Sequence, residues 1–160
     1  MVRQLKSDPA GKGIRAAIVA GRWNEPIVEK LVEGAIRGLV EHQVLEKNIA
    51  VFWVPGAFEI PLMSKKLATS KKYDCLISVG CVLKGETFHF DHIAEAASKG
   101  VLQASLETGI PIAFSVILSD DPRKAWERAG DGEMNSGYRG ALAALEMANL
   151  LKQMKSKKRS

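Results

Sequence analysis

The sequence predicts an α/β protein: a three-layer α/β/α sandwich in which helices cover both faces of a four-stranded parallel sheet. Short apolar runs alternate four times with longer amphipathic stretches, which is the pattern of successive βαβ units. Such connections between parallel strands are right-handed and place the helices on the faces of the sheet. The 160 residues, 46% of them apolar, contain no internal repeat or break in composition, so we expect one domain with a buried core.

The first half of the chain supplies two predicted strands and two helices. Residues 14–21 indicate a strand because the run is short, apolar and closed by glycine. Asn24 can cap the following helix, which carries a proline in its first turn and apolar residues at helical spacing. Residues 49–56 form the second predicted strand. Residues 57–70 form the second helix, which tolerates Pro61 only near its start.

The second half repeats the alternation. Residues 73–83 form the third predicted strand, and a long helix over residues 92–108 follows it and ends at Gly109. Residues 111–119 form the fourth strand. Two more helices complete the prediction, a short one from Asp121-Pro122 to near Gly130 and a last one from Gly140 to Met154.

The net charge of +5 comes from the end of the chain. The last nine residues, KQMKSKKRS, hold five of the 23 basic side chains, which leaves 18 basic against 18 acidic residues elsewhere. We therefore expect an N-terminal segment (1–13), a folded domain (14–151) and a basic, disordered tail (152–160), with no nucleic-acid partner. No apolar run approaches the roughly 20 residues that span a bilayer, and the N-terminus lacks the apolar core of a signal peptide, so we expect no membrane.

The two cysteines, Cys75 and Cys81, lie six residues apart in one apolar run. This even spacing on a strand places both on one face, with their Cα atoms too far apart for a disulfide. Reduced cysteines are the rule in the cytoplasm, where we expect this protein.

Most of the side chains suited to chemistry follow the ends of the predicted strands. The chain reads GRWNE after the first strand, PGAFE after the second, KGETFHFDH after the third and SDDPRKAWERAG after the fourth. Ligands of open parallel sheets bind outside the carboxyl ends of the strands, which meet at one edge. These four segments therefore predict one binding site, and their convergence is stronger evidence than any single motif.

The segment GCVLKGETFHFDHI, residues 80–93, nearly matches a phosphate-binding P-loop. Gly80, Gly85 and Thr87 have the spacing of G-x-x-x-x-G-K-[ST], but Glu86 replaces the lysine, which argues against nucleotide hydrolysis. Free backbone N–H groups at the start of the next helix still favour an anion. Thr87 has an equally good alternative role as a helix cap.

His89 and His92 are three residues apart and could lie on one side of a helix, with Asp91 between them. A metal site usually needs three or four ligands, and no further cysteine or histidine is placed to complete one, so we expect no metal. One imidazole beside an anion site is better suited to proton transfer. A capping or packing role is the main alternative for His92 and a weaker one for His89.

Arg128 belongs to the short helix AWERAG, where it could be solvated or paired with a glutamate one turn away. Near a phosphate, however, its planar guanidinium is the preferred bidentate partner. Trp23 directly follows a strand end, where a core tryptophan is less expected, so it could stack on a flat heterocycle. Phe58 and Phe114 fit the core as well as they fit a site.

The motifs GRWN, VPGAFEIP, GCVLKGETFHFDHI, AWERAG and ALEMANL occur in the order and spacing of the lumazine synthase family, which the chain resembles from about residue 14 to 151. The resemblance implies a flavodoxin-like fold and a transferase of riboflavin biosynthesis that needs no metal or organic cofactor. It would condense 5-amino-6-(D-ribitylamino)uracil with 3,4-dihydroxy-2-butanone 4-phosphate to 6,7-dimethyl-8-ribityllumazine, the penultimate step of that pathway, with release of phosphate and water.

The resemblance also implies a role for each motif residue. His89 would be the general acid/base, and the phosphate of the butanone would be held by Glu86, Thr87 and Arg128. The Trp23 ring would stack on the pyrimidine, and Glu59 would accept hydroxyl groups of the ribityl chain. The full set expected to contact the pyrimidine or its ribityl chain is Trp23, Ala57, Phe58, Glu59, Cys81, Val82, Leu83 and Phe114, with residues 81–83 acting through main-chain groups.

The resemblance further implies an assembly of pentamers, which in this family can pair into decamers or close into an icosahedral capsid of sixty subunits. Phe114 and Arg128 would then reach the site from a neighbouring subunit. The spacing from ERAG to EMANL contains no insertion, which favours the capsid. The expected partners are thus the small-molecule substrates, other copies of the chain and riboflavin synthase.

The chain departs from the family pattern after ERAG, where many relatives read T-K-x-G-N-K-G and this sequence reads DGEMNSGYRG. Asn135 and Gly137 keep their places, but Ser136 replaces a lysine, and Arg139 lies nearby. If that lysine assists phosphate binding, Arg128 or Arg139 must take over its task. Trp23 stands where phenylalanine is commoner, which keeps a flat ring.

Two other functions share this fold. A flavodoxin-like module could hold a flavin or another phosphorylated ligand without catalysis, but it would not require both His89 and Arg128. A cage-forming homologue with decayed sites is the second alternative, and the intact set Trp23, Glu59, His89 and Arg128 argues against it.

Overall fold

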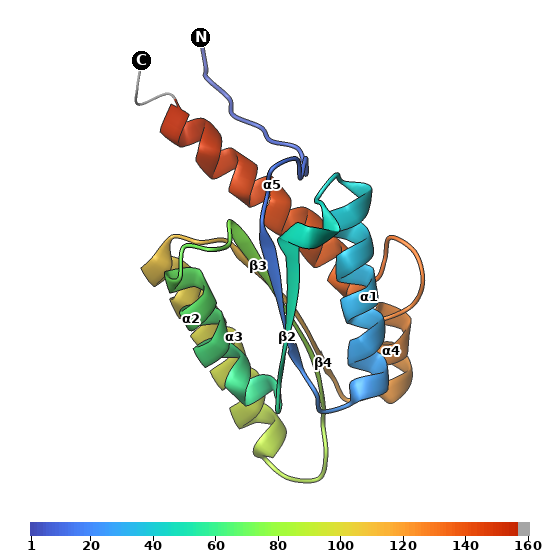
Figure 1. Cartoon of the computed structure of the whole chain (residues 1–160). Coiled ribbons are helices and arrows are strands. Elements are labelled where there is room, and N and C mark those ends of the chain that lie inside the picture. The colour runs from blue at the N-terminus through green and yellow to red at the C-terminus, as the bar shows by residue number, and fades with distance from the viewer. Residues whose placement is uncertain (157–160) are drawn as a thin grey trace.

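A computed structural model describes residues 1–156 and shows the predicted three-layer α/β/α sandwich (Figure 1). Four parallel strands form one sheet in the order β2-β1-β3-β4. In residues 1–156 the helices are all too short or too polar to span a bilayer. In chain order the elements are β1 (Ala16–Gly21), α1 (Glu25–Glu41), η1 (Glu46–Asn48), β2 (Ile49–Val54), η2 (Ala57–Glu59), α2 (Ile60–Thr69), β3 (Cys75–Leu83), α3 (His89–Thr108), β4 (Ile112–Ser119), α4 (Pro122–Arg128) and α5 (Ser136–Ser156).

The two faces of the sheet bury separate apolar clusters, because successive side chains of a strand point to opposite sides. On one face, Ile18 of β1 packs with the apolar sides of α1, α4 and α5. On the other face, Val19 of β1 packs with α2 and α3. All six residues of β1 are buried, which explains why that strand reads as a continuous apolar run instead of an alternating one. The sheet is thus covered on both sides, as Figure 1 shows.

The order of the strands by itself indicates where a ligand would bind. From β1 the chain moves outward to β2, then returns across β1 to β3 and continues to β4. The connections that leave β1 and β3 therefore run to opposite faces of the sheet and leave a crevice at the carboxyl ends of these neighbouring strands. This reversal is the position at which open parallel sheets bind their ligands.

Three predicted helix boundaries were wrong. The predicted second helix is divided into η2 and α2, and Pro61 lies in the first turn of α2. Helix α3 begins at His89 and not at His92, and α5 begins at Ser136 and not at Gly140. Two glycines, Gly137 and Gly140, made the start of α5 resemble a loop, although both are buried where any larger side chain would collide with a neighbour.

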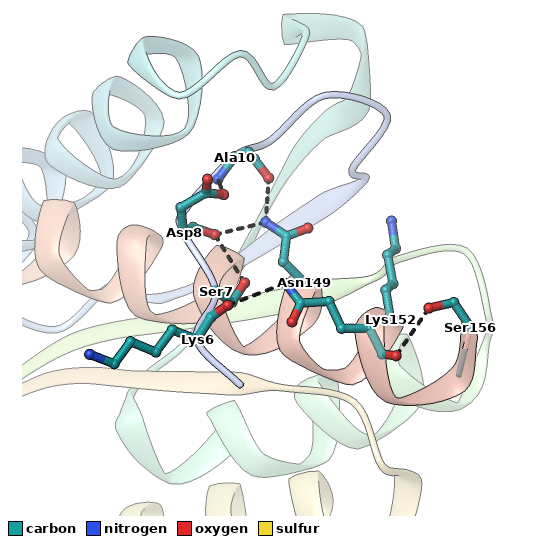
Figure 2. Close-up of a pocket in the computed structure, with 8 residues that line it drawn as sticks. Lys6, Ser7, Asp8, Ala10, Asn149, Lys152 and Ser156 are labelled. Carbon is teal, nitrogen blue, oxygen red and sulfur yellow. Dashed lines mark hydrogen bonds between the residues drawn. The ribbon is translucent and has the colours of Figure 1, made fainter. Parts of the chain in front are cut away.

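The basic tail was predicted to be disordered from residue 152, but α5 continues to Ser156, so residues 152–156 are helical. Residues 157–160, the rest of that predicted tail, lie outside the described part of the chain. The helix is held by the N-terminal segment: Asn149 donates to the carbonyls of Asp8 and Ala10 at 2.9 and 2.6 Å, and Gln153 donates to that of Lys6 at 3.4 Å. Figure 2 shows these side chains bordering an open hollow of about 620 Å³, at the end of the sheet opposite the strand ends discussed below.

Candidate active site

A pocket of about 600 Å³ lies at the carboxyl ends of β1, β2 and β3, at the reversal of strand order. Each of three strand-to-helix connections contributes to its wall, and the first turn of α3 closes one side. The volume is within the range of small-molecule sites. The residues that line it are Trp23, Asn24, Gly56, Ala57, Phe58, Glu59, Cys81, Val82, Leu83, His89 and Ile93.

The β1–α1 turn presents Trp23 to this pocket. The turn is fixed to the neighbouring strand because the N–H of Arg22 donates to the carbonyl of Val54 at 2.9 Å. Trp23 remains 75% exposed, so its ring is not a core residue. A large flat ring kept at the edge of a pocket provides a stacking surface for a planar ligand.

Asn24 has a different role from the predicted helix cap. It lies at the N-terminal boundary of α1 in the left-handed conformation (φ 61°), and its side chain makes no capping hydrogen bond. The carboxamide instead donates to the carbonyl of Cys81 on β3 at 2.9 Å. The β1–α1 turn is thereby tied to the strand that forms the opposite side of the pocket.

The β2–α2 connection forms a second wall through Gly56, Ala57, Phe58 and Glu59. Gly56 lies beneath the tryptophan: a Cβ there would come within 2.6 Å of Cδ1 of Trp23 and 3.4 Å of Oε2 of Glu59. Ala57 is buried, whereas Phe58 is 60% exposed and Glu59 is also exposed. The wall therefore combines an apolar base with an accessible carboxylate that can accept hydrogen bonds from a polyhydroxyl chain.

The end of β3 provides a main-chain edge, that is, backbone N–H and C=O groups that a ligand can pair with. Its pairing with β1 stops at Val79, whereas its pairing with β4 continues to Leu83. Successive residues of a strand direct their N–H and C=O groups to alternate sides. The Cys81 carbonyl points to Asn24, and the N–H of Lys84 points to β4, where it donates to Ser119. The N–H and C=O groups of Leu83 accordingly face the pocket side, as one donor and one acceptor for a planar ligand.

Burial raises the pKa of the Cys81 thiol to about 11 and that of the Cys75 thiol to about 12. Both cysteines are free and belong to the apolar cluster on one face of the sheet, as their spacing predicts. A thiol with so high a pKa stays protonated near neutral pH and is a poor nucleophile. Cys81 therefore serves the pocket through its main chain and not through sulfur.

His89 is the first residue of α3, and its exposed side chain reaches the pocket together with Ile93, one helical turn later. The His89 N–H donates to Oγ1 of Thr87 at 3.3 Å, but Phe88 and not Thr87 occupies the N-cap position of α3, and it makes no side-chain capping hydrogen bond. His92 is exposed and does not line the pocket. Within residues 1–156, histidine, cysteine, aspartate and glutamate do not gather in any group of three that could hold a metal.

The similarity to a P-loop does not extend to the backbone. Gly80 lies inside β3, paired with Val116, so only Gly85 belongs to the connection that follows the strand. Gly80 is closely packed, since a Cβ there would lie 3.3 Å from Cδ1 of Ile60. Glu86 and Thr87 are exposed in this connection, beyond the residues that line the pocket.

Two further predicted site residues, Phe114 and Arg128, are not among those that line the pocket of the single chain. Phe114 lies on the edge strand β4, 39% exposed, and Arg128 is the exposed last residue of α4. The resemblance to the lumazine synthase family implies that both come from a neighbouring subunit, which remains a prediction. Of the residues that replace the lysine motif, Arg139 is exposed, and the carbonyl of half-buried Ser136 accepts a hydrogen bond from Oγ of Ser115 at 2.8 Å.

Three residues that line the pocket were missing from the predicted site: Asn24, Gly56 and Ile93. The signal for Gly56 was in the sequence, since it is the second residue after β2, just as Trp23 is the second residue after β1. Ile93 could have been found from its spacing of four residues after His89 on a helix. Nothing local indicates the contact of Asn24 with Cys81, because 57 residues separate them in the chain.

Comparison with known proteins shows the family of the chain. The family described as 6,7-dimethyl-8-ribityllumazine synthase matches residues 13–152. Two curated relatives with that same name, from two strains of Clostridium kluyveri, are each 51% identical to this chain over 143 residues, which is 89% of this chain and 93% of the relative. With the family pattern covering nearly the whole folded region and half of the aligned residues identical, the chain belongs to the 6,7-dimethyl-8-ribityllumazine synthase family of enzymes.

Proposed function

We propose that this enzyme condenses 5-amino-6-(D-ribitylamino)uracil with 3,4-dihydroxy-2-butanone 4-phosphate to 6,7-dimethyl-8-ribityllumazine, the penultimate step of riboflavin biosynthesis. One observation carries the proposal: a single pocket collects a stacking ring, an exposed carboxylate, a main-chain edge and a histidine from four separate segments of the chain. Membership of the family supports the same reaction.

The pyrimidine fits the part of the pocket between Trp23 and the end of β3. Its flat ring would stack on the indole, where aromatic contact adds to the burial of apolar surface. Its amide edge would pair with the N–H and C=O groups of Leu83, which alternate as a donor and an acceptor. The ribityl chain would run along residues 57–59, where Glu59 accepts hydroxyl protons and Ala57 and Phe58 supply apolar contact.

The phosphate of the butanone fits the connection between β3 and α3. The Glu86 side chain is exposed, so the main-chain N–H groups of Glu86 and Thr87, beside the positive end of α3, are the groups suited to an anion. Arg128 would supply the compensating charge from a neighbouring subunit, in the bidentate geometry that guanidinium and phosphate share. A glutamate in place of the P-loop lysine is then compatible with binding a small monophosphate.

The reaction requires proton transfer at each step. The free amino group on the pyrimidine ring attacks the ketone carbon, and water leaves to form an imine. Loss of a proton and of phosphate then gives an enol, which tautomerises to a ketone. The second nitrogen attacks this new carbonyl carbon, and a second water leaves as the ring closes. His89, at the junction of the two half-sites, is placed to move these protons, which typically contributes 10²–10⁴-fold in rate. Holding both reactants together can contribute more, roughly 7–11 kcal/mol at best.

We further propose that the active site is completed between subunits of a pentamer, and that the pentamers close into an icosahedral capsid. Phe114 on the edge strand β4 and Arg128 at the end of α4 are accessible for such contacts. Riboflavin synthase, which would use the product, is the proposed protein partner. The two free, buried thiols suit a reducing compartment, and we place the enzyme in the cytoplasm.

The test is a direct assay. The purified protein is mixed with the pyrimidine and the butanone phosphate, and the absorbance of the lumazine is followed against the spontaneous reaction. Saturable acceleration is expected, and a rate equal to the spontaneous one would refute the enzyme. Light scattering on the same sample measures the assembly, and a mass below that of a pentamer would refute the shared site.

A further inference from the structure

In the turn between β1 and α1, Asn24 makes hydrogen bonds to α1 and to β3 and is directly preceded in the chain by Trp23. Its carbonyl accepts the first hydrogen bonds of α1, from the N–H groups of Ile27 at 3.0 Å and Val28 at 3.1 Å. Its side chain donates to the Cys81 carbonyl on β3 at 2.9 Å. Its peptide bond to Trp23 then fixes where the indole leaves the turn. A substitution of Asn24 therefore affects both the Trp23 ring and the main-chain groups at the end of β3.

The backbone and the side chain make separate demands that few residues meet. With φ at 61°, the position lies in the left-handed region, which glycine enters freely and asparagine or aspartate occasionally. The contact with a carbonyl oxygen requires an N–H donor, which aspartate lacks and glycine cannot supply. Asparagine satisfies both demands. As a helix cap it would not need the donor, since a cap uses the side-chain oxygen.

The bond to Cys81 also determines which main-chain groups of β3 remain for a ligand. Beyond Val79 the strand has no ladder with β1, so the Cys81 carbonyl would otherwise face the pocket without a partner. The carboxamide takes this acceptor and leaves the groups of Leu83, two residues later, on the same side. The N–H and C=O groups of Leu83, which also lines the pocket with Trp23, thereby remain for a ligand.

We propose that Asn24 is a positioning residue for the pyrimidine half-site: its carboxamide holds the Trp23 ring and the Leu83 main-chain edge in register with each other. This inference rests on the proposed function for the identity of the ligand. It does not extend to the phosphate half-site, because within residues 1–156 no hydrogen bond joins Asn24 to a residue between Leu83 and the start of α3.

Two variants separate the side chain from the backbone. Asn24→Gly keeps the left-handed conformation and removes the donor, and Asn24→Asp keeps the shape but sets a carboxylate against the Cys81 carbonyl. We expect Asn24→Gly to raise KM for the pyrimidine roughly tenfold, the loss typical of one hydrogen bond, and Asn24→Asp to raise it more, because two acceptors then face each other. KM for the butanone phosphate should change less than about twofold in both variants.

A matched control is available at Gln43, which has φ 74° in an exposed turn at the end of α1. Gln43→Gly makes the same exchange in the same backbone region and should leave both KM values unchanged. An equal rise of both KM values in Asn24→Gly, or none in either Asn24 variant, would overturn the positioning role.

A second readout does not depend on catalysis. With Trp53 and Trp126 replaced by phenylalanine, Trp23 is the only indole in the chain. Adding Asn24→Gly to this background should lower the fluorescence anisotropy of Trp23 and raise its quenching by iodide, whereas Gln43→Gly should change neither. Unchanged fluorescence would overturn the proposal even in an active enzyme. A wild-type protein that forms no lumazine would refute the proposed function but leave this fluorescence comparison valid.

Discussion

The indole of Trp23 packs over Gly56 so closely that a Cβ on the glycine would lie 2.6 Å from Cδ1 of the ring. Gly56 has φ −159° and ψ −174°, an extended conformation that any residue adopts. The requirement for glycine therefore comes from the ring above it and not from the backbone. The position of the Trp23 ring thus depends on the missing side chain at Gly56, in the β2–α2 connection, as well as on the β1–α1 turn that carries the ring.

Gly56→Ala should displace the Trp23 ring and weaken binding of the pyrimidine. We expect KM for the pyrimidine to rise by about tenfold, with the KM of the butanone phosphate unchanged, because stacking is made with only one substrate. The free energy of unfolding should change by less than about 0.5 kcal/mol, since the colliding ring is mostly exposed and can move. Steady-state kinetics and urea unfolding measure the two effects.

The collision can be isolated with a double-mutant cycle. Trp23→Ala removes the ring that carries the colliding Cδ1, so Gly56→Ala should cost less in that background. The same cost in both backgrounds would mean that Gly56 acts through something other than the tryptophan.

His89→Ala should lose part of the rate but not all of it. The variant keeps the pocket that holds both substrates together, which can contribute more to the rate than one general acid/base. We expect kcat to fall by up to about 10²–10⁴-fold, to a level still measurable above the spontaneous reaction, with both KM values close to wild type. His92→Ala, three residues along the same helix, is the control and should retain full activity. Equal losses in the two variants would remove the special role of His89.

Asn135 should make a large contribution to stability. Its side chain is 2% exposed; its amide donates to the carbonyls of Lys30 at 3.1 Å and Gly130 at 3.0 Å, and its oxygen accepts from the N–H groups of Gly137 at 2.8 Å and Tyr138 at 3.0 Å. Asn135→Ala removes the cap of α5 and leaves buried groups without partners. We expect a loss of about 2–4 kcal/mol in the free energy of unfolding.

Asn149→Ala is the matched control for this loss. Asn149 also donates to two carbonyls, those of Asp8 and Ala10, but on the exposed side of α5, where water can replace it. Its loss should cost less than about 1 kcal/mol in urea unfolding. If the two variants were equally destabilised, burial would not be the reason for the importance of Asn135.

Asn135 illustrates which features of the fold the sequence could predict and which it could not. The four strands were predictable because a buried parallel strand is an apolar run, and the parallel topology followed from the alternation with helices. The start of α5 was missed because Gly137 and Gly140 resemble a loop, and the buried contacts that explain this segment, such as that of Asn135 with Lys30, are with residues far away in the chain. Local patterns carry no information about such contacts.

The same limit applies to the pocket. Residues such as Trp23 and Glu59 line one pocket because they follow strand ends, and all strand ends of a parallel sheet meet at one edge. Asn24 was assigned to the wrong task because its helix position explains it locally, whereas its partner lies on β3. Phe114 and Arg128 lie outside the pocket of the single chain, so their assignment to the site stays a prediction.

Arg128→Ala should raise KM for the butanone phosphate sharply and leave KM for the pyrimidine nearly unchanged. A guanidinium–phosphate contact acts on only the phosphorylated substrate, and loss of a charged hydrogen bond costs about 1.5–3 kcal/mol, or roughly 10- to 150-fold. Arg123→Ala is the control on the same helix, because Arg123 is 91% exposed and paired with Asp121. A similar loss of saturation for both substrates in Arg128→Ala would refute the phosphate contact.

If Arg128 completes the pocket of a neighbouring subunit, two impaired variants should partly restore each other's activity. In an assembly refolded from equal amounts of Arg128→Ala and His89→Ala chains, a site that takes His89 from one subunit and Arg128 from the next has both groups in about a quarter of cases. We expect activity near that fraction of wild type, and none beyond the mean of the parents when the assembled variants are mixed without unfolding. Were both residues supplied by one subunit, every site would lack one of them, and co-refolding would restore nothing. The activity thus shows whether His89 and Arg128 of one site come from different subunits, because no chain in the mixture carries both residues.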